Sequence, residues 1–307
     1  MSILILTGPT AAGKTAAAMA LAHAHRVRLI SVDSAMVYRG LDIGSAKPSP
    51  AELARYPHAL IDIRDPAEPY TVSEFVADAD AQVRAALDAG ETPVLVGGTM
   101  MYLQAFREGL DQLPRTSAEV REHVKGRAAE EGWPALHEEL KRTDPVAAER
   151  IHPNNPQRLA RALEVQQMTG QPISSFWGKA PGAAERFGCA VRTLVVDVSE
   201  RAVLHRRIEQ RLDIMLEMGL LDEVAGLRER SDLHADLPAM RAVGYRQVWQ
   251  HLDGDLTLEE MRDRVLTATR TLARRQYTWI RRWDDAQTVQ MDGSQAADEA
   301  LARLAFR

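Results

Sequence analysis

The chain has 307 residues, of which 45% are hydrophobic and 26% are charged, and this composition excludes a disordered protein and a collagen-like repeat. Its 38 basic and 43 acidic residues give a net charge of −5, so nucleic-acid binding would have to come from local patches. No apolar run reaches the ~18 residues of a membrane span. The single cysteine, Cys189, excludes an internal disulfide framework and a cysteine-based zinc cluster, and fits a cytoplasmic protein.

Short β-type runs alternate with helical runs in the first hundred residues. Apolar runs over 3–7, 28–32 and 93–96 predict strands, and the segments 14–25 and 73–89 have the Ala-rich composition or the apolar spacing of helices. Strand, helix, strand is the pattern of a parallel sheet covered by helices. We therefore expect an α/β fold with a parallel sheet at its core.

The β signal disappears at residue 114 and returns with an apolar strand over 191–198. Helical patterns in between are expected over 117–131, 134–142, 145–151 and 156–169. After the strand, helices are expected over 200–218, 220–230, 241–252 and 258–283. The chain is thus predicted to form a core domain of residues 1–113 and 190–307, with helices at its C-terminal end, and a helical insertion domain of residues 114–189.

A glycine-rich loop between the first strand and the first helix is the strongest motif. It fits the pattern G-x-x-x-x-G-K-[ST] in the strand–loop–helix context that the pattern requires. Backbone N–H groups of such a loop surround phosphate oxygens, and the helix N-terminus adds partial positive charge. Lys14 adds a full charge, and the Thr15 hydroxyl is placed to reach Mg²⁺. The loop predicts a polyphosphate ligand, either ATP or a diphosphate ester, held by Gly8, Pro9, Thr10, Ala11, Ala12, Gly13, Lys14 and Thr15.

Two further loops follow predicted strands at the same edge of the sheet. Asp33 comes directly after the strand over 28–32, where ligand crevices lie in open α/β sheets. It is a candidate general base, a Mg²⁺ ligand through water, or a cap of the next segment. Gly97 and Gly98 follow a later strand and predict either a close backbone approach or a tight turn, with Thr99 offering a hydroxyl.

The last long helix concentrates positive charge. Residues 262–282 hold seven arginines and one acidic residue. Arg270, Arg274, Tyr277 and Arg281 fall within an arc of about 60° on one helical face. Arginines interleaved with an aromatic side chain suit contacts with phosphates and with a base or ribose. A solvated basic face is the alternative interpretation.

Six segments of the chain share one family pattern, namely 8–15, 30–48, 95–102, 154–165, 241–249 and 274–283. Together, and in this order, they resemble the bacterial tRNA dimethylallyltransferase family, also called tRNA isopentenyltransferases. The resemblance implies transfer of a dimethylallyl group from dimethylallyl diphosphate to N6 of the adenosine 3′-adjacent to the anticodon in tRNA. It also implies a P-loop NTPase-like core and an insertion domain that grips the anticodon stem-loop.

The resemblance further implies roles for individual residues. Thr10, Gly13, Lys14 and Thr15 would hold the diphosphate, with Mg²⁺ at Thr15. Asp33 would take the proton from N6, with Thr99 and Arg211 as further catalytic residues and Arg211 as the second cation on the diphosphate. Contacts with tRNA are implied for Asp33, Ser34, Ala35, Met36, Thr99, Arg121, Gln157, Arg158, Leu159, Ala160, Arg161, Arg241, Ala242, Val243, Gly244, Tyr245, Arg246, Arg274, Arg275, Gln276, Tyr277, Thr278, Trp279, Ile280 and Arg281.

The sequence departs from the family in two respects. Ala12 stands where the family often has Ser, so one hydroxyl donor is replaced by backbone donors. The zinc-finger extension of eukaryotic relatives is absent, so no zinc is expected.

Two other functions use parts of the same pattern. A P-loop kinase would bind ATP at the loop and use Asp33 on an acceptor hydroxyl or on magnesium, but a small acceptor needs neither a helical insertion nor an arginine-rich helix. A non-enzymatic RNA-binding protein with a relic loop would not need Lys14, Thr15 and Asp33. We therefore expect an enzyme whose partners are tRNA and dimethylallyl diphosphate, without membrane attachment.

Overall fold

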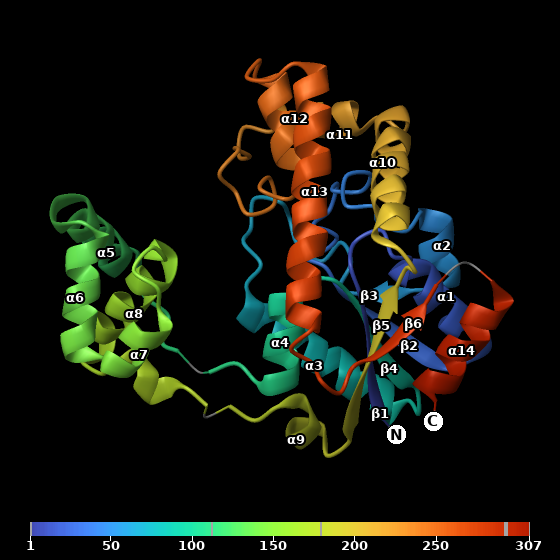
Figure 1. Ribbon diagram of the computed structural model, residues 1–307, viewed down its shortest axis with the longest axis horizontal. Coiled ribbons are helices and arrows are strands. Elements are labelled where there is room, and N and C mark those ends of the chain that lie inside the picture. Colours follow the sequence, from blue (N-terminus) through green and yellow to red (C-terminus); the bar gives the residue numbers. More distant parts are fainter. Residues whose placement is uncertain (1, 112, 179, 292–293, 307) are drawn as a thin grey trace. The chain divides into compact units, whose positions relative to one another are not determined.

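The computed structural model describes residues 2–111, 113–178, 180–291 and 294–306. The chain forms two compact units, one of residues 1–107 and 183–307 and one of residues 108–182 (Figure 1). The insertion was expected over 114–189, so its predicted start lies six residues, and its predicted end seven residues, beyond the observed bounds of 108 and 182. Helix α9 (Ala183–Phe187) explains the second difference, because Ala183 is buried in the core of the first unit and Arg186 forms an ion pair with Asp80 there.

A six-stranded sheet with the order β3-β2-β4-β1-β5-β6 forms the centre of the first unit. Every neighbouring pair is parallel, which confirms the expected fold class. Two short edge strands, β3 and β6, were not predicted. The strands are β1 (Ser2–Thr7), β2 (Val27–Val32), β3 (His58–Ala59), β4 (Thr92–Gly97), β5 (Ala190–Asp197) and β6 (Gln287–Gln290).

Helices cover both faces of this sheet and enclose a separate core on each face. Side chains alternate between the faces along a strand, so β1 sends Ile3 and Ile5 into one core and Leu4 and Leu6 into the other. Helices α1 and α14 contribute to the second of these cores. The helices of the first unit besides α9 are α1 (Lys14–Ala24), α2 (Pro50–Arg55), α3 (Val72–Asp88), α4 (Met100–Glu108), α10 (Arg201–Glu217), α11 (Leu220–Arg228), α12 (Tyr245–Leu252), α13 (Leu258–Ile280) and α14 (Gln295–Ala305).

Local sequence signals set several helix ends. Thr257 accepts a hydrogen bond from the Glu260 amide, and the Glu260 carboxylate reaches back to the Thr257 amide, which is a capping box at the start of α13. Helix α12 begins four residues later than expected. Gly244 has a φ of +95°, a left-handed conformation that keeps the preceding residues out of the helix.

The second unit is helical and has a core of its own. Its helices are α5 (Ala118–Glu131), α6 (Trp133–Thr143), α7 (Pro145–Arg150), α8 (Pro156–Thr169) and a short 3₁₀ helix (Ile173–Phe176). Helix α8 has the bounds predicted from sequence. Asn155 caps its first turn, and Gly170 closes it with a φ of +68°. Among the described residues of either unit, none forms a helix long and apolar enough to cross a bilayer.

Candidate active site

The glycine-rich loop is shaped by close packing and by one lysine. A Cβ atom at Gly8 would lie 2.0 Å from the carbonyl oxygen of Val196, so only glycine fits there. Gly13 stands at the N-terminus of α1 with a φ of +101°. The Lys14 Nζ donates to the carbonyl oxygens of Gly8 at 3.1 Å and Pro9 at 2.8 Å. The loop therefore wraps around the lysine amine, which fixes the Lys14 side chain against the loop.

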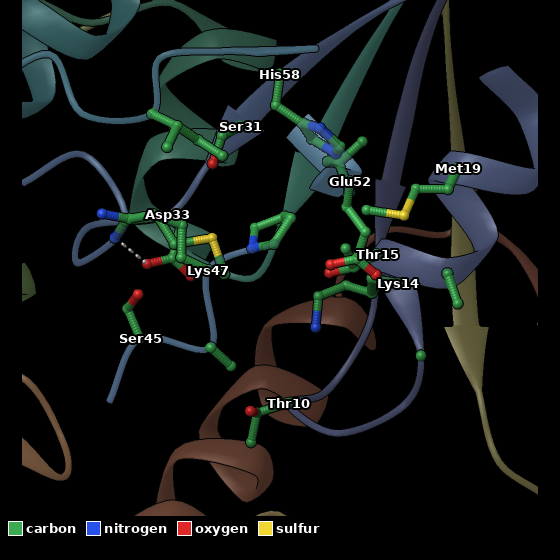
Figure 2. A pocket seen from close by; sticks show the side chains of 18 of the residues that line it. Thr10, Lys14, Thr15, Met19, Ser31, Asp33, Ser45, Lys47, Glu52 and His58 are labelled. Atoms are coloured by element: carbon green, nitrogen blue, oxygen red, sulfur yellow. Dashed lines mark hydrogen bonds between the residues drawn. The ribbon is translucent and has the colours of Figure 1, made fainter. Parts of the chain in front are cut away.

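A cavity of about 500 Å³ lies over this loop. Lys14 and Thr15 line it from the first turn of α1, Asp33 from the end of β2, and Arg211 from α10; Figure 2 shows the first three around the same hollow. The structure thus brings together the predicted loop, carboxylate and second cation. Arg207, one helical turn before Arg211, also lines the cavity and donates to the Ala12 carbonyl at 3.3 Å.

Arg207 was not predicted as a site residue, although the four-residue spacing from Arg211 places both on one helical face. His58 was not predicted as a site residue either. His58 lines the cavity (Figure 2), and its Nδ1 lies 2.7 Å from the Tyr56 carbonyl. Burial lowers the pKa of His58, so its neutral form is favoured.

Two of the cations that line the cavity, Lys14 and Arg211, are held without full solvation. Burial, and then the positive charge of Arg211, lower the pKa of Lys14 to about 8, against the opposing attraction of Asp33. Burial also lowers the pKa of Arg211, again opposed by Asp33. Adjacent desolvated cations repel each other, and an anion placed between them relieves that cost. The cavity therefore favours a ligand with several negative charges.

Asp33 both shapes a turn and faces this cavity. Its Oδ1 accepts hydrogen bonds from the amides of Ala35 at 2.8 Å and Met36 at 3.1 Å, so the capping interpretation is confirmed. Neither bond uses Oδ2, so the cap does not compete with a chemical role. Thr99 supports the same turn, because its Oγ1 accepts from the Ser34 amide at 3.1 Å.

The close backbone approach predicted at Gly97 and Gly98 is confirmed, and the partner is the chain itself. A Cβ at Gly97 would lie 2.0 Å from the carbonyl oxygen of Val32, and one at Gly98 would lie 2.4 Å from Gln276 Nε2. Gln276 is buried; it accepts from the Thr10 amide at 2.8 Å and donates to the Gly98 carbonyl at 3.0 Å. Its implied contact with tRNA is corrected: this side chain ties the phosphate loop to the loop after β4.

Two other residues with implied tRNA contacts are core residues. Tyr245 is fully buried, and its hydroxyl donates to Glu223 at 2.6 Å. Its ring packs so closely against Gly44 that a Cβ at that position would have no room. Leu159 is equally buried in the core of the second unit. Neither side chain presents surface to RNA. Both were among the implied contacts because a sequence motif does not separate the residues that face solvent from those that support them.

The arginine face of α13 borders a second cavity in the first unit, of about 660 Å³. Arg270, Arg274, Tyr277 and Arg281 line it, as their helical spacing predicted, and Arg201 faces them from α10. Arg270 forms an ion pair with Glu209, and the Tyr277 hydroxyl donates to Asp197 at 2.6 Å. Arg274 and Arg281 are exposed, as are Arg241, Arg246, Arg275 and Thr278.

The second unit holds further residues with implied tRNA contacts. Gln157 and Arg158 are exposed in the first turn of α8. Arg121 and Arg161 both donate to the Thr116 hydroxyl, at 3.2 and 3.1 Å. Their guanidinium groups are thereby held in fixed positions near one another, each with donors to spare.

Comparison with known proteins gives consistent results along the chain. The model of the IPP transferase family matches residues 36–283. A tRNA dimethylallyltransferase of Albidiferax ferrireducens is 51% identical, over 97% of this chain and 89% of that protein. One of Chromohalobacter salexigens is 53% identical, over 97% of this chain and 95% of that protein.

Solved structures of tRNA isopentenylpyrophosphate and dimethylallyltransferases have a fold similar to that of this chain. The tRNA isopentenylpyrophosphate transferase of Bacillus halodurans superposes with a TM-score of 0.70 at 34% identity, over 99% of this chain and 95% of that one. A eukaryotic dimethylallyltransferase acting on tRNA has a TM-score of 0.84 over 98% of this chain and 78% of that one. Its identity of 23% supports the fold alone.

Proposed function

The chain belongs to the IPP transferase family, and on that premise we propose that it transfers a dimethylallyl group from dimethylallyl diphosphate to N6 of the adenosine 3′-adjacent to the anticodon in tRNA. The observation that carries this proposal is the meeting of Lys14, Arg211 and Asp33 at one cavity. A diphosphate leaving group needs cations, and an amine acceptor needs a base. The cavity supplies both, so the chain is a prenyltransferase acting on tRNA.

The reaction makes one bond and breaks another. The N6 nitrogen bonds to C1 of the allyl group, the bond between C1 and the diphosphate oxygen breaks, and N6 gives up a proton. The exocyclic amine is a poor nucleophile because its lone pair is delocalised into the ring. Lys14, Arg211 and the loop amides neutralise the charge that develops on the departing diphosphate. Asp33 takes the proton through Oδ2, while Oδ1 stays fixed by the turn.

The residues of the cavity fit a magnesium ion bound together with the diphosphate. The Thr15 hydroxyl and the Asp33 carboxylate line the cavity as oxygen donors. The described residues contain no cluster of three or more His, Cys, Asp or Glu side chains suited to a metal. Mg²⁺ commonly takes one or two protein ligands and completes its shell with water and phosphate. Thr15 would hold the ion, which when bound adds positive charge at the diphosphate oxygens.

The acceptor adenine has to leave its stack to reach the cavity, because a stacked base does not expose N6 to a buried centre. The exposed arginines of α13 are suited to the RNA backbone. In the second unit, Arg121, Gln157, Arg158 and Arg161 are the polar groups for gripping the anticodon stem-loop. The base and the phosphates are thus contacted by different parts of the chain.

The choice of donor tests the proposal directly. The purified protein is incubated with tRNA and either dimethylallyl diphosphate labelled in the allyl group or ATP labelled in the γ-phosphate. We expect allyl label in the tRNA without any nucleotide being added. Phosphoryl transfer from ATP, with no prenylated RNA, would replace the proposal by a kinase.

Removal of two arginines from the α13 face should weaken tRNA binding and flatten its dependence on salt. Arg274→Ala with Arg281→Ala removes two exposed cations that line the second cavity. For every arginine that pairs with a phosphate, its removal lowers the slope of log affinity against log salt by ~0.7–0.9. The slope is measured by titrating tRNA at several salt concentrations. Arg264→Ala, at an exposed position of α13 outside that cavity, is the matched control. An equal slope in the wild-type protein, the double variant and the control would mean that the arginine face of α13 is solvated and does not contact RNA.

Binding of the donor should depend on pH through Lys14. Because the pKa of Lys14 is lowered to about 8, the free protein loses this charge as the pH rises through 8, and its affinity for the diphosphate falls. A bound anion raises the pKa again, so binding above pH 8 takes up a proton. Calorimetry in two buffers with different ionisation enthalpies measures that uptake. Lys14→Met should abolish it; uptake that persists in the variant would assign the proton to another group.

A further inference from the structure

Gln276 is a buried amide in the arginine-rich helix α13. Its side chain is 5% exposed, although the preceding Arg274 and Arg275 are exposed. The Gln276 Oε1 accepts from the Thr10 amide at 2.8 Å, and its Nε2 donates to the Gly98 carbonyl at 3.0 Å. A side chain that meets an N–H group and a carbonyl oxygen at once needs an acceptor and a donor, and a carboxamide has both. These two bonds, and not the filling of the core, therefore account for glutamine at this position.

The loop that Gln276 reaches after β4 lies between the two halves of the candidate active site. In the sheet, β4 is flanked by β2 on one side and by β1 on the other. Asp33 follows β2, and the phosphate loop follows β1. The loops that carry the proposed base and the diphosphate are thus not on neighbouring strands, and the loop after β4 stands between them.

Hydrogen bonds join these three loops in a row. Gln276 connects Thr10 of the phosphate loop to Gly98 after β4. The next residue, Thr99, accepts a hydrogen bond from the Ser34 amide at 3.1 Å through its Oγ1. Ser34 belongs to the turn whose carboxylate is the proposed base. The row therefore runs from the loop that holds the diphosphate to the turn that takes the proton.

The proposed reaction depends on the separation of these two loops. The phosphate loop holds the leaving group and Asp33 receives the proton, so C1 of the allyl group and N6 of the adenine have to fit between them. A misplacement of about 1 Å can slow a reaction by about 100-fold. Thr10 and Asp33 line the cavity over the phosphate loop (Figure 2), whereas Gln276 does not. Gln276 can therefore affect the reaction only through the loops that it joins.

We propose that Gln276 is a positioning residue that sets the separation between the phosphate loop and the Asp33 turn. The inference rests on the proposed function, because it assigns Gln276 to the transfer step. Loss of the amide slows the chemical step and leaves both substrate affinities nearly unchanged, since the groups that contact the diphosphate and the RNA remain. The bridge matters while Asp33 acts as the base, so its loss costs little where that base is already absent.

Single turnovers of the full-length protein with tRNA and dimethylallyl diphosphate test this assignment. Gln276→Leu keeps a similar volume and removes both bonds, and at saturating substrates we expect its rate to fall roughly 10- to 100-fold. In a protein that already carries Asp33→Asn, the same change should slow the reaction by no more than about twofold. Two independent effects would instead multiply to within about twofold of the full loss.

Gly98→Ala disturbs the same bridge by another route, and it keeps the assignment testable if Gln276→Leu does not fold. A Cβ at Gly98 would lie 2.4 Å from Gln276 Nε2, so it displaces the amide without opening the core. We expect the same loss of rate, again confined to proteins that retain Asp33. Val265→Ala, at a buried position in the first half of α13, is the control that should lower the unfolding midpoint with little effect on the rate.

Three results overturn the positioning role. They are wild-type rates in both Gln276→Leu and Gly98→Ala, a full further loss in the Asp33→Asn protein, and a loss that disappears when the substrates are saturating. Each of these requires that the wild-type protein transfers the prenyl group, so each rejects the role of Gln276 and not the proposed function. The absence of prenyl transfer by the wild-type protein would reject the proposed function, and the positioning role with it.

Discussion

Replacing Asp33 by Asn should lower the rate of a single turnover by at least about 100-fold, the lower end for a positioned general base. The Asn side-chain oxygen keeps the two bonds that Asp33 Oδ1 accepts from Ala35 and Met36, but the amide does not accept a proton from N6. Affinities for tRNA and for dimethylallyl diphosphate should change little. Rapid-quench measurement at saturating concentrations of both substrates isolates the chemical step.

The Asp33→Ala variant is the control that separates chemistry from shape. It loses the turn cap, which typically contributes ~1 kcal/mol, so the protein should still fold. Near-normal turnover in Asp33→Asn with slow turnover in Asp33→Ala would mean that Asp33 orients the adenine and that another group takes the proton. Near-normal turnover in both variants would reduce Asp33 to a turn cap.

Replacing Lys14 by Met should lower kcat/KM by about 100- to 1,000-fold, the effect of losing one charge-stabilising donor, while leaving the unfolding midpoint unchanged or higher. The charge that stabilises the leaving group is costly in the free protein, because burial and Arg211 lower the pKa of Lys14 to about 8. A Met side chain of similar length removes that cost along with the catalytic charge. Activity assays and thermal unfolding of the same preparations measure both effects.

The sign of the stability effect follows from proton linkage. Between a folded pKa of about 8 and the ordinary value of 10.5, the unfolded chain binds more protons at Lys14 than the folded protein does, so this residue contributes rising stability with pH there. Lys14→Met should lose that rise, and Lys14→Arg is the control that keeps a charge. A markedly lower midpoint in Lys14→Met would show instead that Lys14 braces the loop through Gly8 and Pro9.

Local sequence patterns were sufficient to predict which residues meet at the candidate active site. The P-loop motif needs only the order strand, loop, helix, and parallel strands bring their carboxyl ends to one edge, so Lys14, Thr15 and Asp33 were expected at the same place. Helical spacing likewise grouped Arg274, Tyr277 and Arg281 on one face. These features depend on short-range geometry, which sequence spacing expresses directly.

The features that escaped prediction depend on long-range packing. Strand β3 has two residues, and β6 is an edge strand in which only Val289 is buried, so neither has a recognisable apolar alternation. Gln276 lies in an arginine-rich helix and resembles a solvent-facing residue, yet it bonds to Thr10, 266 positions away. Tyr245 is polar enough for a surface, yet it is buried, and Glu223 accepts its hydroxyl.

Identification of the modified nucleoside is the most direct measurement of all. Unmodified tRNA is incubated with the protein and dimethylallyl diphosphate, digested to nucleosides and fragments, and analysed by mass spectrometry. We expect one product, N6-dimethylallyladenosine, confined to the position 3′-adjacent to the anticodon and nearly absent with Asp33→Asn at the same reaction time. A prenyl group on another atom or at scattered adenosines, or equal yields with Asp33→Asn, would contradict a cavity in which Lys14 and Arg211 hold the diphosphate and Asp33 takes the proton.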